Sequence, residues 1–361
     1  MEKVLQVLGS LQRGGAETLV MNIYRNIDKK NIQFDFIVRE NVDNGYEEEV
    51  KKLGGRIFVI PSPQKIGLKE CIRRHIDVIK NNGPYICVHS HMNAMSFISM
   101  YAAKKCKIKN RISHSHSTSF PGKIKLLFGR YLTKKYSTKL LACSKDAGLK
   151  LFGNSNFEII PNCIILDNFL VSDEDEKNKY MKKLNLSTET TNIIHVGRFV
   201  EPKNHEFIIE IAKKLIKNDF KFNLYLLGDG PKYGDIKKLI ISNNLSNNVH
   251  LLGSLSNVNE YMRAADLMIM PSLYEGFPVT LVESQTSGLP SIVSCNITKK
   301  VDFGLNLIQF IPLEIDEWIN CIEKKKYQRL FNKERIYETI TKNNYNIIDT
   351  VKKIEKIYTE E

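Results

Sequence analysis

The sequence lacks the features that mark membrane-spanning, disulfide-bonded and zinc-binding proteins. None of its apolar runs reaches the roughly 20 residues that a helix needs to cross a bilayer. Its seven cysteines are scattered without CxxC spacing, and an odd number argues against a disulfide framework. No His, Cys and Asp cluster has the spacing of a zinc site. These absences favour a cytoplasmic protein whose cysteines are mostly small core residues.

Two further motifs are missing or weak. No G-x-G-x-x-G follows the first apolar segment, residues 3–8, so a dinucleotide-dependent dehydrogenase is disfavoured. We expect this segment to be a strand rather than part of a signal peptide. A D-x-D triplet occurs at residues 173–175. Its charged, low-complexity surroundings predict a solvated linker or a helix start rather than a metal site.

Acidic residues are absent from Val78 to Lys145, in a chain whose net charge is +13. The cations of this stretch are Lys80, Lys104, Lys105, Lys107, Lys109, Arg111, Lys123, Lys125, Arg130, Lys134, Lys135, Lys139 and Lys145. Within it, residues 123–135 have the pattern of a basic amphipathic helix. The stretch is either a solvated face or a surface for an anionic membrane or lipid-phosphate acceptor. Nucleic acid is least favoured, because no nucleic-acid-binding motif accompanies the charge.

The chain alternates apolar strands with amphipathic helices, which is typical of parallel sheets covered on both faces. Expected strands are residues 3–8, 33–38, 57–60, 85–89, 110–116, 139–143 and 157–160, and then 192–197, 222–227, 248–252, 266–270 and 291–294. A length of 361 residues also favours two domains. We therefore predict an α/β protein with two Rossmann-like domains facing across a cleft. The first would span residues 1–170 and be completed by the C-terminal helix 343–361, and the second would span 171–342.

Two glutamates eight residues apart, Glu275 and Glu283, are the most informative pair for function. The apolar run before them predicts a buried parallel strand, and Val279, Val282 and Thr286 have helical spacing after Pro278. The pair would then be at most roughly 12 Å apart, with a helix N-terminus suited to an anion between them. One carboxylate can hold sugar hydroxyls and the other ribose hydroxyls.

A cationic pair follows the first strand of the second domain. Arg198 comes directly after Gly197, and Lys203 lies on the same loop. Arginine offers a planar fork to phosphate oxygens and lysine a compact charge, so the two can neutralise a diphosphate leaving group without a metal. Small residues around Gly228 and near Leu255 end the next two strands. They leave room for a base or ribose, although simple turn chemistry also explains them.

Glycines and histidines gather at strand ends of the first domain. Gly14 and Gly15 join the first strand to the first helix, where backbone amides can approach a ligand closely. Strand alternation places His114 and His116 on one face, and likewise His89 and His91. Neutral imidazoles can hydrogen-bond to a sugar. A metal is disfavoured because no carboxylate or cysteine accompanies the rings.

These motifs together resemble the retaining glycosyltransferases of family four, which have the GT-B fold. They are Gly-Gly-Ala-Glu near the start, Val-Gly-Arg followed by Lys203, Gly-Asp-Gly-Pro, and Glu-Gly-Phe-Pro with a second glutamate eight residues on. The segment from Gly288 to Thr298 lacks the glycine-rich turn of the wider family and is similar to the branch that builds bacterial capsules and exopolysaccharides.

The resemblance implies roles for particular residues. Glu275 would touch the donor sugar, Glu283 the ribose, and Arg198 and Lys203 the diphosphate. His116 would approach the donor sugar and act in catalysis with Glu275, Arg198 and Lys203; His114 is the other candidate. Gly14 and Gly15 would line the cleft between donor and acceptor. Further donor contacts are expected from Gly197, Gly228, Leu255, Gly276, Phe277 and Pro278, and acceptor or secondary contacts from His114, His91 and Glu17.

We accordingly expect sugar transfer, with retention, from a nucleotide diphosphate sugar, UDP-linked, to a hydroxyl of a growing lipid-linked surface polysaccharide. The first domain would face the acceptor and the second would bind the nucleotide sugar. No cofactor or metal is expected, and the protein would be cytoplasmic or peripheral on the inner membrane face. Two alternatives remain open: a sugar-nucleotide epimerase of the same architecture, and a catalytically silent module that binds sugar nucleotides or anionic lipids.

Overall fold

The chain folds into two units in the computed structural model, which describes residues 1–41, 45–117, 123–325 and 327–360, with only the backbone of 123–126. The first unit comprises Met1–Ile164 and Asn344–Glu361, and the second comprises Ile165–Asn343. Each unit is described by itself. The expected boundary after residue 170 lies six residues beyond Ile164.

The first unit contains a seven-stranded parallel sheet in the order β3-β2-β1-β4-β5-β6-β7. Its strands are β1 (Glu2–Val7), β2 (Ile32–Val38), β3 (Ile57–Val59), β4 (Cys87–Ser90), β5 (Asn110–Ser115), β6 (Lys139–Ala142) and β7 (Glu158–Ile159). The helices between them are α1 (Gly15–Asn26), α2 (Glu47–Lys52), α3 (Pro63–Ile66), α4 (Leu68–Asn82), α5 (Phe97–Lys105), α6 (Lys123–Tyr136) and α7 (Lys145–Phe152), with the 3₁₀ turn η1 (Asn93–Ser96). A second 3₁₀ turn, η2 (Leu166–Asn168), begins the second unit.

The second unit contains a six-stranded parallel sheet in the order β10-β9-β8-β11-β12-β13. Its strands are β8 (Thr191–Val196), β9 (Phe222–Leu227), β10 (Val249–Gly253), β11 (Leu267–Met270), β12 (Ser291–Ser294) and β13 (Ile308–Ile311). Its helices are α8 (Glu174–Lys183), α9 (His205–Lys217), α10 (Tyr233–Ser242), α11 (Val258–Ala264), α12 (Val279–Thr286), α13 (Ile315–Glu323) and α14 (Lys333–Lys342), with 3₁₀ turns η3 (Glu201–Lys203) and η4 (Lys299–Val301).

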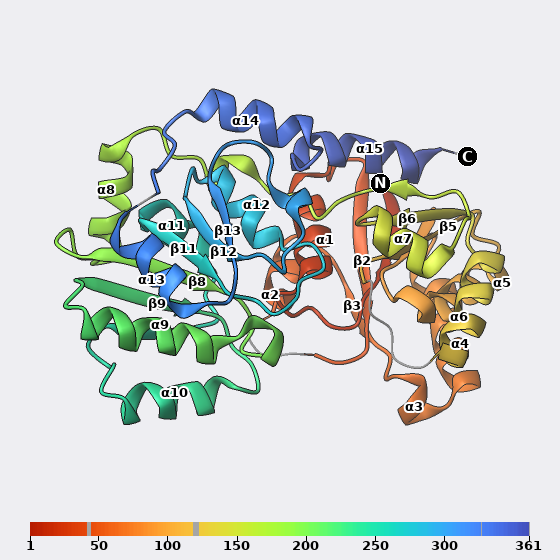
Figure 1. The fold of residues 1–361 in the computed structure, drawn as a ribbon. Coiled ribbons are helices and arrows are strands. Elements are labelled where there is room, and N and C mark those ends of the chain that lie inside the picture. The colour runs from red at the N-terminus through yellow and green to blue at the C-terminus, as the bar shows by residue number, and fades with distance from the viewer. Residues whose placement is uncertain (42–44, 118–122, 326, 361) are drawn as a thin grey trace. The chain divides into compact units, whose positions relative to one another are not determined.

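Helices cover both faces of each sheet, which explains why its inner strands are mostly buried (Figure 1). Every residue of β2 is buried, and the four residues of β11 are fully buried. The expected strands are confirmed within a few residues, and β13 was not expected. The D-x-D segment is a helix start, because the Asp173 side chain accepts a hydrogen bond from the Glu176 amide and so caps α8.

The last helix, α15 (Ile347–Thr359), returns to the first unit and packs on α1. The return is fixed by hydrogen bonds as well as by apolar packing. Ile164 forms a parallel bridge with Asn346, and the Asn110 side chain on β5 donates to the Ile357 carbonyl at 2.6 Å. Tyr358 is therefore buried beside the first sheet, where its ring meets Phe34 edge-on.

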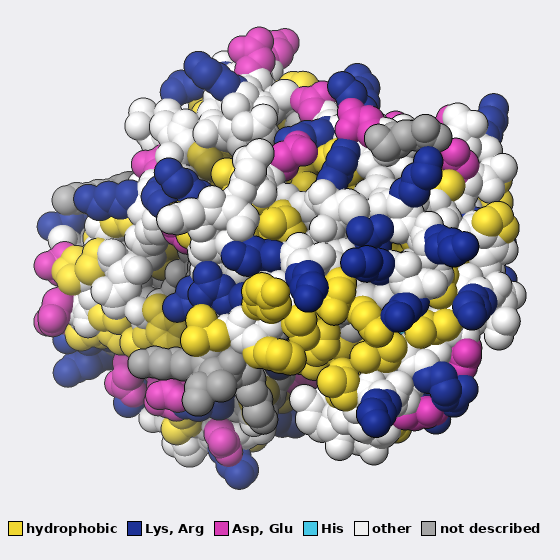
Figure 2. All heavy atoms as spheres, turned by 90° about the vertical axis from the view of Figure 1, so that its right-hand side faces the viewer, with side chains coloured by type: hydrophobic (Ala, Val, Ile, Leu, Met, Phe, Trp, Pro, Cys, Tyr) yellow, Lys and Arg dark blue, Asp and Glu magenta, His cyan; other side chains and the backbone are white. Residues whose placement is uncertain are grey.

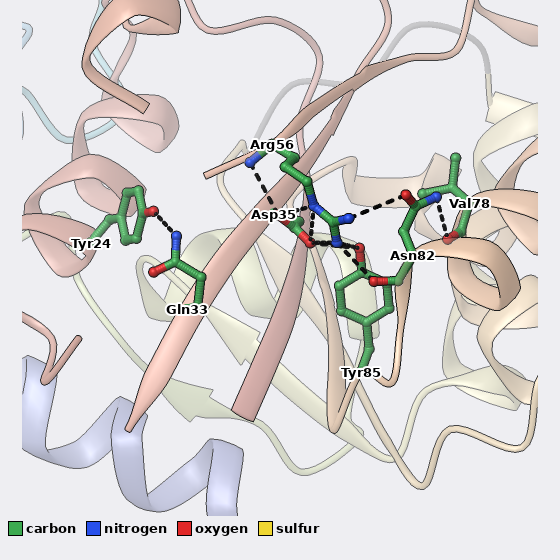
Figure 3. Close-up of polar contacts among 7 residues, drawn as sticks. All are labelled: Tyr24, Gln33, Asp35, Arg56, Val78, Asn82 and Tyr85. Carbon is green, nitrogen blue, oxygen red and sulfur yellow. Dashed lines mark hydrogen bonds and ion pairs between the residues drawn. The ribbon is translucent and has the colours of Figure 1, made fainter. Parts of the chain in front are cut away.

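Figure 3 shows two groups of polar contacts that stabilise the interior of the first unit. Buried Asp35 on β2 accepts hydrogen bonds from Arg56, at 2.5 Å, and from the Tyr85 hydroxyl, at 2.7 Å. The Gln33 amide donates to the Tyr24 hydroxyl at 2.6 Å, and Tyr24 in turn donates to a backbone carbonyl. Both groups are satisfied by neighbours of the same unit, as buried polar groups must be.

Helix α6, expected as a basic amphipathic helix, carries exposed apolar side chains. Leu127, Phe128 and Tyr131 are each about three-fifths exposed, at 61%, 61% and 59%. Figure 2 shows hydrophobic side chains gathered on the face that contains this part of the first unit, with Lys and Arg side chains around them. Among the described residues, no helix is long and apolar enough to cross a membrane.

Candidate functional site

Each sheet reverses its strand order at one place, and the candidate residues lie at these reversal points. In the first sheet the chain builds outward from β1 to β3 and then restarts with β4 on the other side of β1. In the second sheet the reversal lies between β8 and β11. Loops at the carboxyl ends of strands beside such a point form the usual ligand site of open α/β sheets.

In the second unit, two loops at the reversal point are joined to each other. The loop after β8 contains η3, and the loop after β11 leads into α12. The side-chain amide of Asn204 donates to the Pro271 carbonyl at 3.1 Å, and the backbone amide of Leu273 donates to the Pro202 carbonyl at 2.8 Å. Asn204 has a φ of +55°, a left-handed conformation that asparagine tolerates better than most residues. These contacts fix the side chains that the loops carry.

Lys203 and Glu275 form an ion pair between these loops, with 2.6 Å between Nζ and Oε1. The Ser272 hydroxyl also donates to Glu275 Oε1, at 2.7 Å. The two charged side chains are only 17% and 13% exposed. The family resemblance implied that Lys203 holds a diphosphate and that Glu275 contacts a sugar. The structure brings them into direct contact, so a ligand here meets a neutralised pair rather than a free cation.

Arg198 lies on the same loop as Lys203 but differs in its surroundings. It is exposed, and its guanidinium has no hydrogen-bond partner among the described residues. Gly197 precedes it, and a β-carbon at Gly197 would lie 3.2 Å from the Lys203 side-chain carbons. The glycine thus leaves room for the lysine stem. Arg198 is the cation of this site that is available to an anion without breaking a contact.

Gly228 is required by backbone packing. It has a φ of +141°, and a β-carbon there would lie 2.0 Å from the Gly197 carbonyl oxygen. Its amide donates to the Gly253 carbonyl at 2.8 Å, so the loops after three neighbouring strands touch one another. Close approach of the loops is therefore a sufficient reason for this glycine. Leu255 and Phe277, both expected to contact the donor, pack against the core cluster that includes Met268 and Leu281.

Helix α12 begins directly after Pro278, and Glu283 is its fifth residue. The Leu281 amide donates to the Pro278 carbonyl at 3.0 Å, and the amides before it belong to the first turn, where a helix leaves donors free for an anion. A β-carbon at Gly276 would meet nothing within 4 Å, so this loop position is open. Burial raises the pKa of Glu283 to about 7. The carboxyl group therefore titrates near neutral pH in the absence of a ligand.

In the first unit, the turn between β1 and α1 is the counterpart of these loops. Helix α1 begins at Gly15, and Gly14 is its N-cap. A β-carbon at Gly14 would lie 2.4 Å from Glu17 Oε2, so this carboxylate folds back over the turn. Burial raises the pKa of Glu17, against a backbone hydrogen bond that lowers it. A β-carbon at Gly15 would lie 3.1 Å from Asn162 Nδ2.

Four histidine rings gather at the same edge of the first sheet, as strand alternation predicted. The centroids of His114 and His116 are 4.1 Å apart, those of His89 and His91 4.2 Å, and those of His91 and His116 5.0 Å. His114 is fully buried, whereas His116 is partly exposed. His116 is thus the better placed of the two to meet a ligand.

Burial keeps all four rings neutral. It lowers the pKa values of His89, His91 and His114 well below the usual range, and the neighbouring rings lower them further. Burial also lowers the pKa of His116 to about 4, and the Asn162 side chain beside the ring opposes that shift. The histidine cluster is therefore polar but uncharged at neutral pH.

Three of these histidines could hold a metal ion. Ring nitrogens of His89, His91 and His114 lie within 4.8 Å of one another. This group contains neither a carboxylate nor a thiolate among the described residues, so it offers a metal neutral ligands only. Metal independence stays a prediction from the sequence.

Four further residues belong to the two sites and were not singled out from the sequence. Ser272 supports Glu275, and Asn162 lies beside His116 and Gly15. Gln6 and Tyr358 contact the histidine cluster from β1 and from α15. A buried glutamine inside an apolar strand was a usable signal for Gln6. No local pattern could have indicated Tyr358, which lies 352 residues from Gln6.

Comparisons with known proteins agree with this geometry. The profile of the family described as "Glycosyl transferases group 1" matches residues 176–298. The "Putative glycosyltransferase EpsF" of Bacillus subtilis (strain 168) is 38% identical, over 99% of this chain and 96% of that protein. The "UDP-Gal:alpha-D-GlcNAc-diphosphoundecaprenol alpha-1,3-galactosyltransferase" of Escherichia coli is 26% identical, over 84% of each chain.

Solved structures show the same fold at low sequence identity. The crystal structure of Anabaena Alr3699/HepE in complex with UDP-glucose superposes with a TM-score of 0.77, over 99% of both chains, at 15% identity. At that identity the likeness concerns the fold alone.

Proposed function

The chain belongs to the glycosyl transferases group 1 and has the GT-B fold, and from this premise we propose the reaction that its site performs. The proposed reaction moves a sugar from a nucleotide diphosphate sugar, UDP-linked, to a hydroxyl of a growing lipid-linked surface polysaccharide, with retention and without a metal. One observation carries the proposal: Lys203 and Glu275 meet at the second reversal point, beside exposed Arg198 and the first turn of α12.

The cations and the helix N-terminus suit a leaving diphosphate. Arg198 offers two parallel N–H groups to phosphate oxygens, and Lys203 offers a point charge. The first turn of α12 adds amide donors and a partial positive charge. Such groups stabilise negative charge where it develops, which is the largest single contribution in many enzymes. The pair of cations would thus act in place of a metal ion.

Glu275 would exchange partners when the donor binds. In the free protein it accepts hydrogen bonds from Lys203 and from Ser272. An arriving diphosphate competes for the lysine, and the carboxylate is then available to hydroxyl groups of the sugar. Glu283, more than one turn further along α12, would accept from ribose hydroxyls as its ionised form.

Retention would follow from attack on the same face as the departing diphosphate. The bond between the anomeric carbon and the phosphate oxygen breaks, and the acceptor oxygen forms the new bond to that carbon. The acceptor's proton passes to the leaving phosphate oxygen. Arg198, Lys203 and the helix amides hold that oxygen in place, so catalysis rests on positioning and electrostatic stabilisation.

Two similarities support the donor and acceptor classes. The HepE crystal contains UDP-glucose, and the Escherichia coli relative is named for a UDP-galactose donor and a diphosphoundecaprenol-linked acceptor. A lipid-linked acceptor also explains exposed apolar groups on α6. Leu127, Phe128 and Tyr131 could enter the interface of an anionic membrane, with Lys134 and Lys135 beside them in contact with lipid phosphates.

A donor screen tests the proposal. The full-length protein is incubated with individual nucleotide diphosphate sugars and lipid-linked acceptors from a bacterial envelope extract, and released nucleotide diphosphate is measured. We expect release that depends on the acceptor, and product NMR should show a retained anomeric configuration. Release at background level with every donor would favour the silent binding module. A hexose epimer formed without an acceptor would favour the epimerase, and an inverted anomeric centre would exclude the proposed stereochemistry.

A further inference from the structure

A continuous chain of hydrogen bonds runs through the interior of the first unit, from α15 to the edge of the first sheet. The Gln6 amide nitrogen lies 2.9 Å from the Tyr358 hydroxyl, and Gln6 Oε1 lies 3.0 Å from His91 Nε2. The other nitrogen of His91 lies 2.8 Å from His116 Nε2. All of these side chains are buried except that of His116, which is partly exposed.

The Gln6 side chain gives this chain a direction, because its two ends differ chemically. Its NH₂ group donates to Tyr358, so its carbonyl oxygen must accept from His91. Nε2 of His91 therefore carries a proton. In a neutral imidazole the other nitrogen is then an acceptor, which takes its hydrogen bond from Nε2–H of His116. Nδ1 of His116 is left with a lone pair.

The opposite end of the chain is consistent with this direction. The Tyr358 hydroxyl accepts from Gln6 and has one proton to donate, and His89 Nδ1 lies 2.8 Å away. Burial keeps these rings neutral, because it lowers the pKa values of His89 and His91 well below the usual range. With Nδ1 as an acceptor, neutral His89 carries its proton on Nε2, which is buried and has no partner among the described residues.

Two acceptors without a donor remain at the edge of the sheet. His116 Nδ1 and Asn162 Oδ1 are both buried, and neither makes a hydrogen bond of normal geometry with a described residue, although the Asn162 side chain lies close enough to the ring to raise its pKa. The two side chains lie beside each other, and Asn162 Nδ2 lies 3.1 Å from the place of a β-carbon on Gly15. Buried acceptors of this kind are costly to leave unsatisfied. Both are therefore suited to a ligand that brings O–H groups to the turn between β1 and α1.

We propose that Tyr358, Gln6 and His91 hold the proton of His116 on Nε2, so that His116 Nδ1 and Asn162 Oδ1 accept hydrogen bonds from hydroxyl groups of a sugar. Asn162 is then a further binding residue, and Tyr358, Gln6 and His91 are positioning residues. The identification of the ligand as a sugar rests on the proposed function. The fixed tautomer of His116 does not.

A metal ion on His89, His91 and His114 is the competing account of the same cluster. Both nitrogens of His91 are already engaged, one with Gln6 and one with His116. The metal-capable group contains no carboxylate or thiolate among the described residues, so a divalent charge would be buried without an anion to offset it. The hydrogen-bond chain uses the rings as they stand.

NMR of the ligand-free protein with ¹⁵N-labelled histidine measures the tautomer directly. The His116 signals are assigned by their loss in His116→Gln. In the unmodified protein we expect a single neutral form with its proton on Nε2. In Tyr358→Phe the Gln6 amide loses its acceptor and can turn over, so both tautomers of His116 should appear.

Tyr24→Phe is the matched control. Tyr24 is also a fully buried tyrosine of the first unit whose hydroxyl accepts from a glutamine amide, Gln33, and donates to an acceptor. Figure 3 shows its hydrogen bond to Gln33, and its recorded hydrogen bonds and ring contacts among the described residues involve no histidine. We expect Tyr24→Phe to leave the His116 tautomer unchanged, even where it lowers the melting temperature as much as Tyr358→Phe does.

A second pair of variants guards against loss of folding at Tyr358. Gln6→Glu keeps an oxygen acceptor for His91 and should preserve the Nε2–H form of His116, whereas Gln6→Leu should not. With the donor identified by the screen, Asn162→Ala and Tyr358→Phe should each raise KM for the sugar substrate by about 3- to 10-fold, the range of one lost hydrogen bond.

The possible outcomes separate this inference from the proposed function. A proton on His116 Nδ1 in the unmodified protein, equal effects of Tyr358→Phe and Tyr24→Phe on the tautomer, or one equivalent of metal bound by the purified protein would each overturn the inference, even in an active transferase. The expected tautomers in a protein that transfers no sugar would refute only the proposed function and, with it, the sugar as ligand.

Discussion

The two reversal points differ in the chemistry that they present. The first carries neutral, mostly buried imidazoles, and two of its acceptors lack a donor among the described residues. The second carries charge: an exposed arginine and a partly buried lysine–glutamate pair. Neutral acceptors suit hydroxyl groups, whereas fixed cations suit a diphosphate. The same reversal of strand order thus presents different chemistry in the two units, because the side chains at the strand ends differ.

Removal of the charges at the second reversal point should have the largest effect. We expect Arg198→Ala and Lys203→Ala each to reduce kcat by at least about 10²-fold, in line with the loss of oxyanion-type stabilisation. Lys203→Ala also leaves the largely buried Glu275 carboxylate without its partner. Steady-state kinetics measure both effects. Lys213→Ala, which removes an exposed ion pair with Glu210 on α9, should be neutral. Near-normal rates for the first two variants would remove the assigned role.

Removal of the partly exposed imidazole at the first reversal point should have a smaller effect. We expect His116→Ala to lower kcat/KM by about 10- to 30-fold, because a positioned hydrogen bond is lost but no charge. The His116 ring itself should add no pH dependence above about pH 5, since burial lowers its pKa to about 4. A rate that rises or falls through pH 6.5 and loses that dependence in His116→Ala would show that the ring titrates in the ordinary range.

The proposed contact of Glu283 with the ribose predicts that nucleotide binding depends on pH. Its pKa is raised to about 7, so the group is mostly protonated below that pH in the free protein. If the ionised form accepts from ribose hydroxyls, affinity for UDP should increase by up to about tenfold between about pH 6 and pH 8. Isothermal titration calorimetry measures this, and Glu283→Gln should bind with one affinity at both pH values. Tighter binding at the lower pH would contradict the assignment.

The same shift predicts a change in stability, with the sign set by which state holds the proton. Because the folded pKa of Glu283 lies above the unfolded value, the folded state binds more protons between about pH 4.5 and pH 7. Stability therefore falls as pH rises through this window. We expect Glu283→Gln to melt at a higher temperature than the unmodified protein at pH 8 and at an equal temperature near pH 4.5. An equal increase in melting temperature at both pH values would have a cause other than the titration of Glu283.

The smallest effects concern the exposed apolar side chains of α6 and the proposal that they meet a membrane. We expect the protein to bind anionic vesicles, with each cation near the surface worth about 1 kcal/mol, and to be released by salt. Phe128→Ser on α6 should weaken vesicle co-sedimentation several-fold. Ile241→Ser is the control, because Ile241 is 59% exposed, much like Phe128, but lies on α10 of the second unit. Binding that is absent or indifferent to salt would leave this face as ordinary solvated surface.

The sequence was informative where function depends on local pattern. Continuous apolar runs such as Leu267–Met270 predicted the strands. Gly197, Arg198 and Lys203 come after the end of β8, where a ligand-binding loop is expected. The contact between Lys203 and Glu275 could not be predicted from the sequence, because it depends on which strands become neighbours where the strand order reverses. β13 was missed because Ile308–Ile311 is short and half exposed, with a polar residue inside it.

Long-range polar contacts could not be predicted at all. Gln6 and Tyr358 lie at opposite ends of the chain and meet only because α15 packs on the first unit. The sequence offered four histidines near one edge and no means to decide which nitrogens carry protons. That choice is made by a buried amide and a hydroxyl, through geometry rather than through residue spacing.

A crystal of the protein soaked with UDP tests the central claim most directly. We predict that the diphosphate lies within hydrogen-bond distance of both Arg198 and Lys203, at the first turn of α12, with Glu283 on the ribose. A nucleotide bound away from the carboxyl ends of β8 and β11, with Lys203 still held by Glu275 alone, would contradict the account.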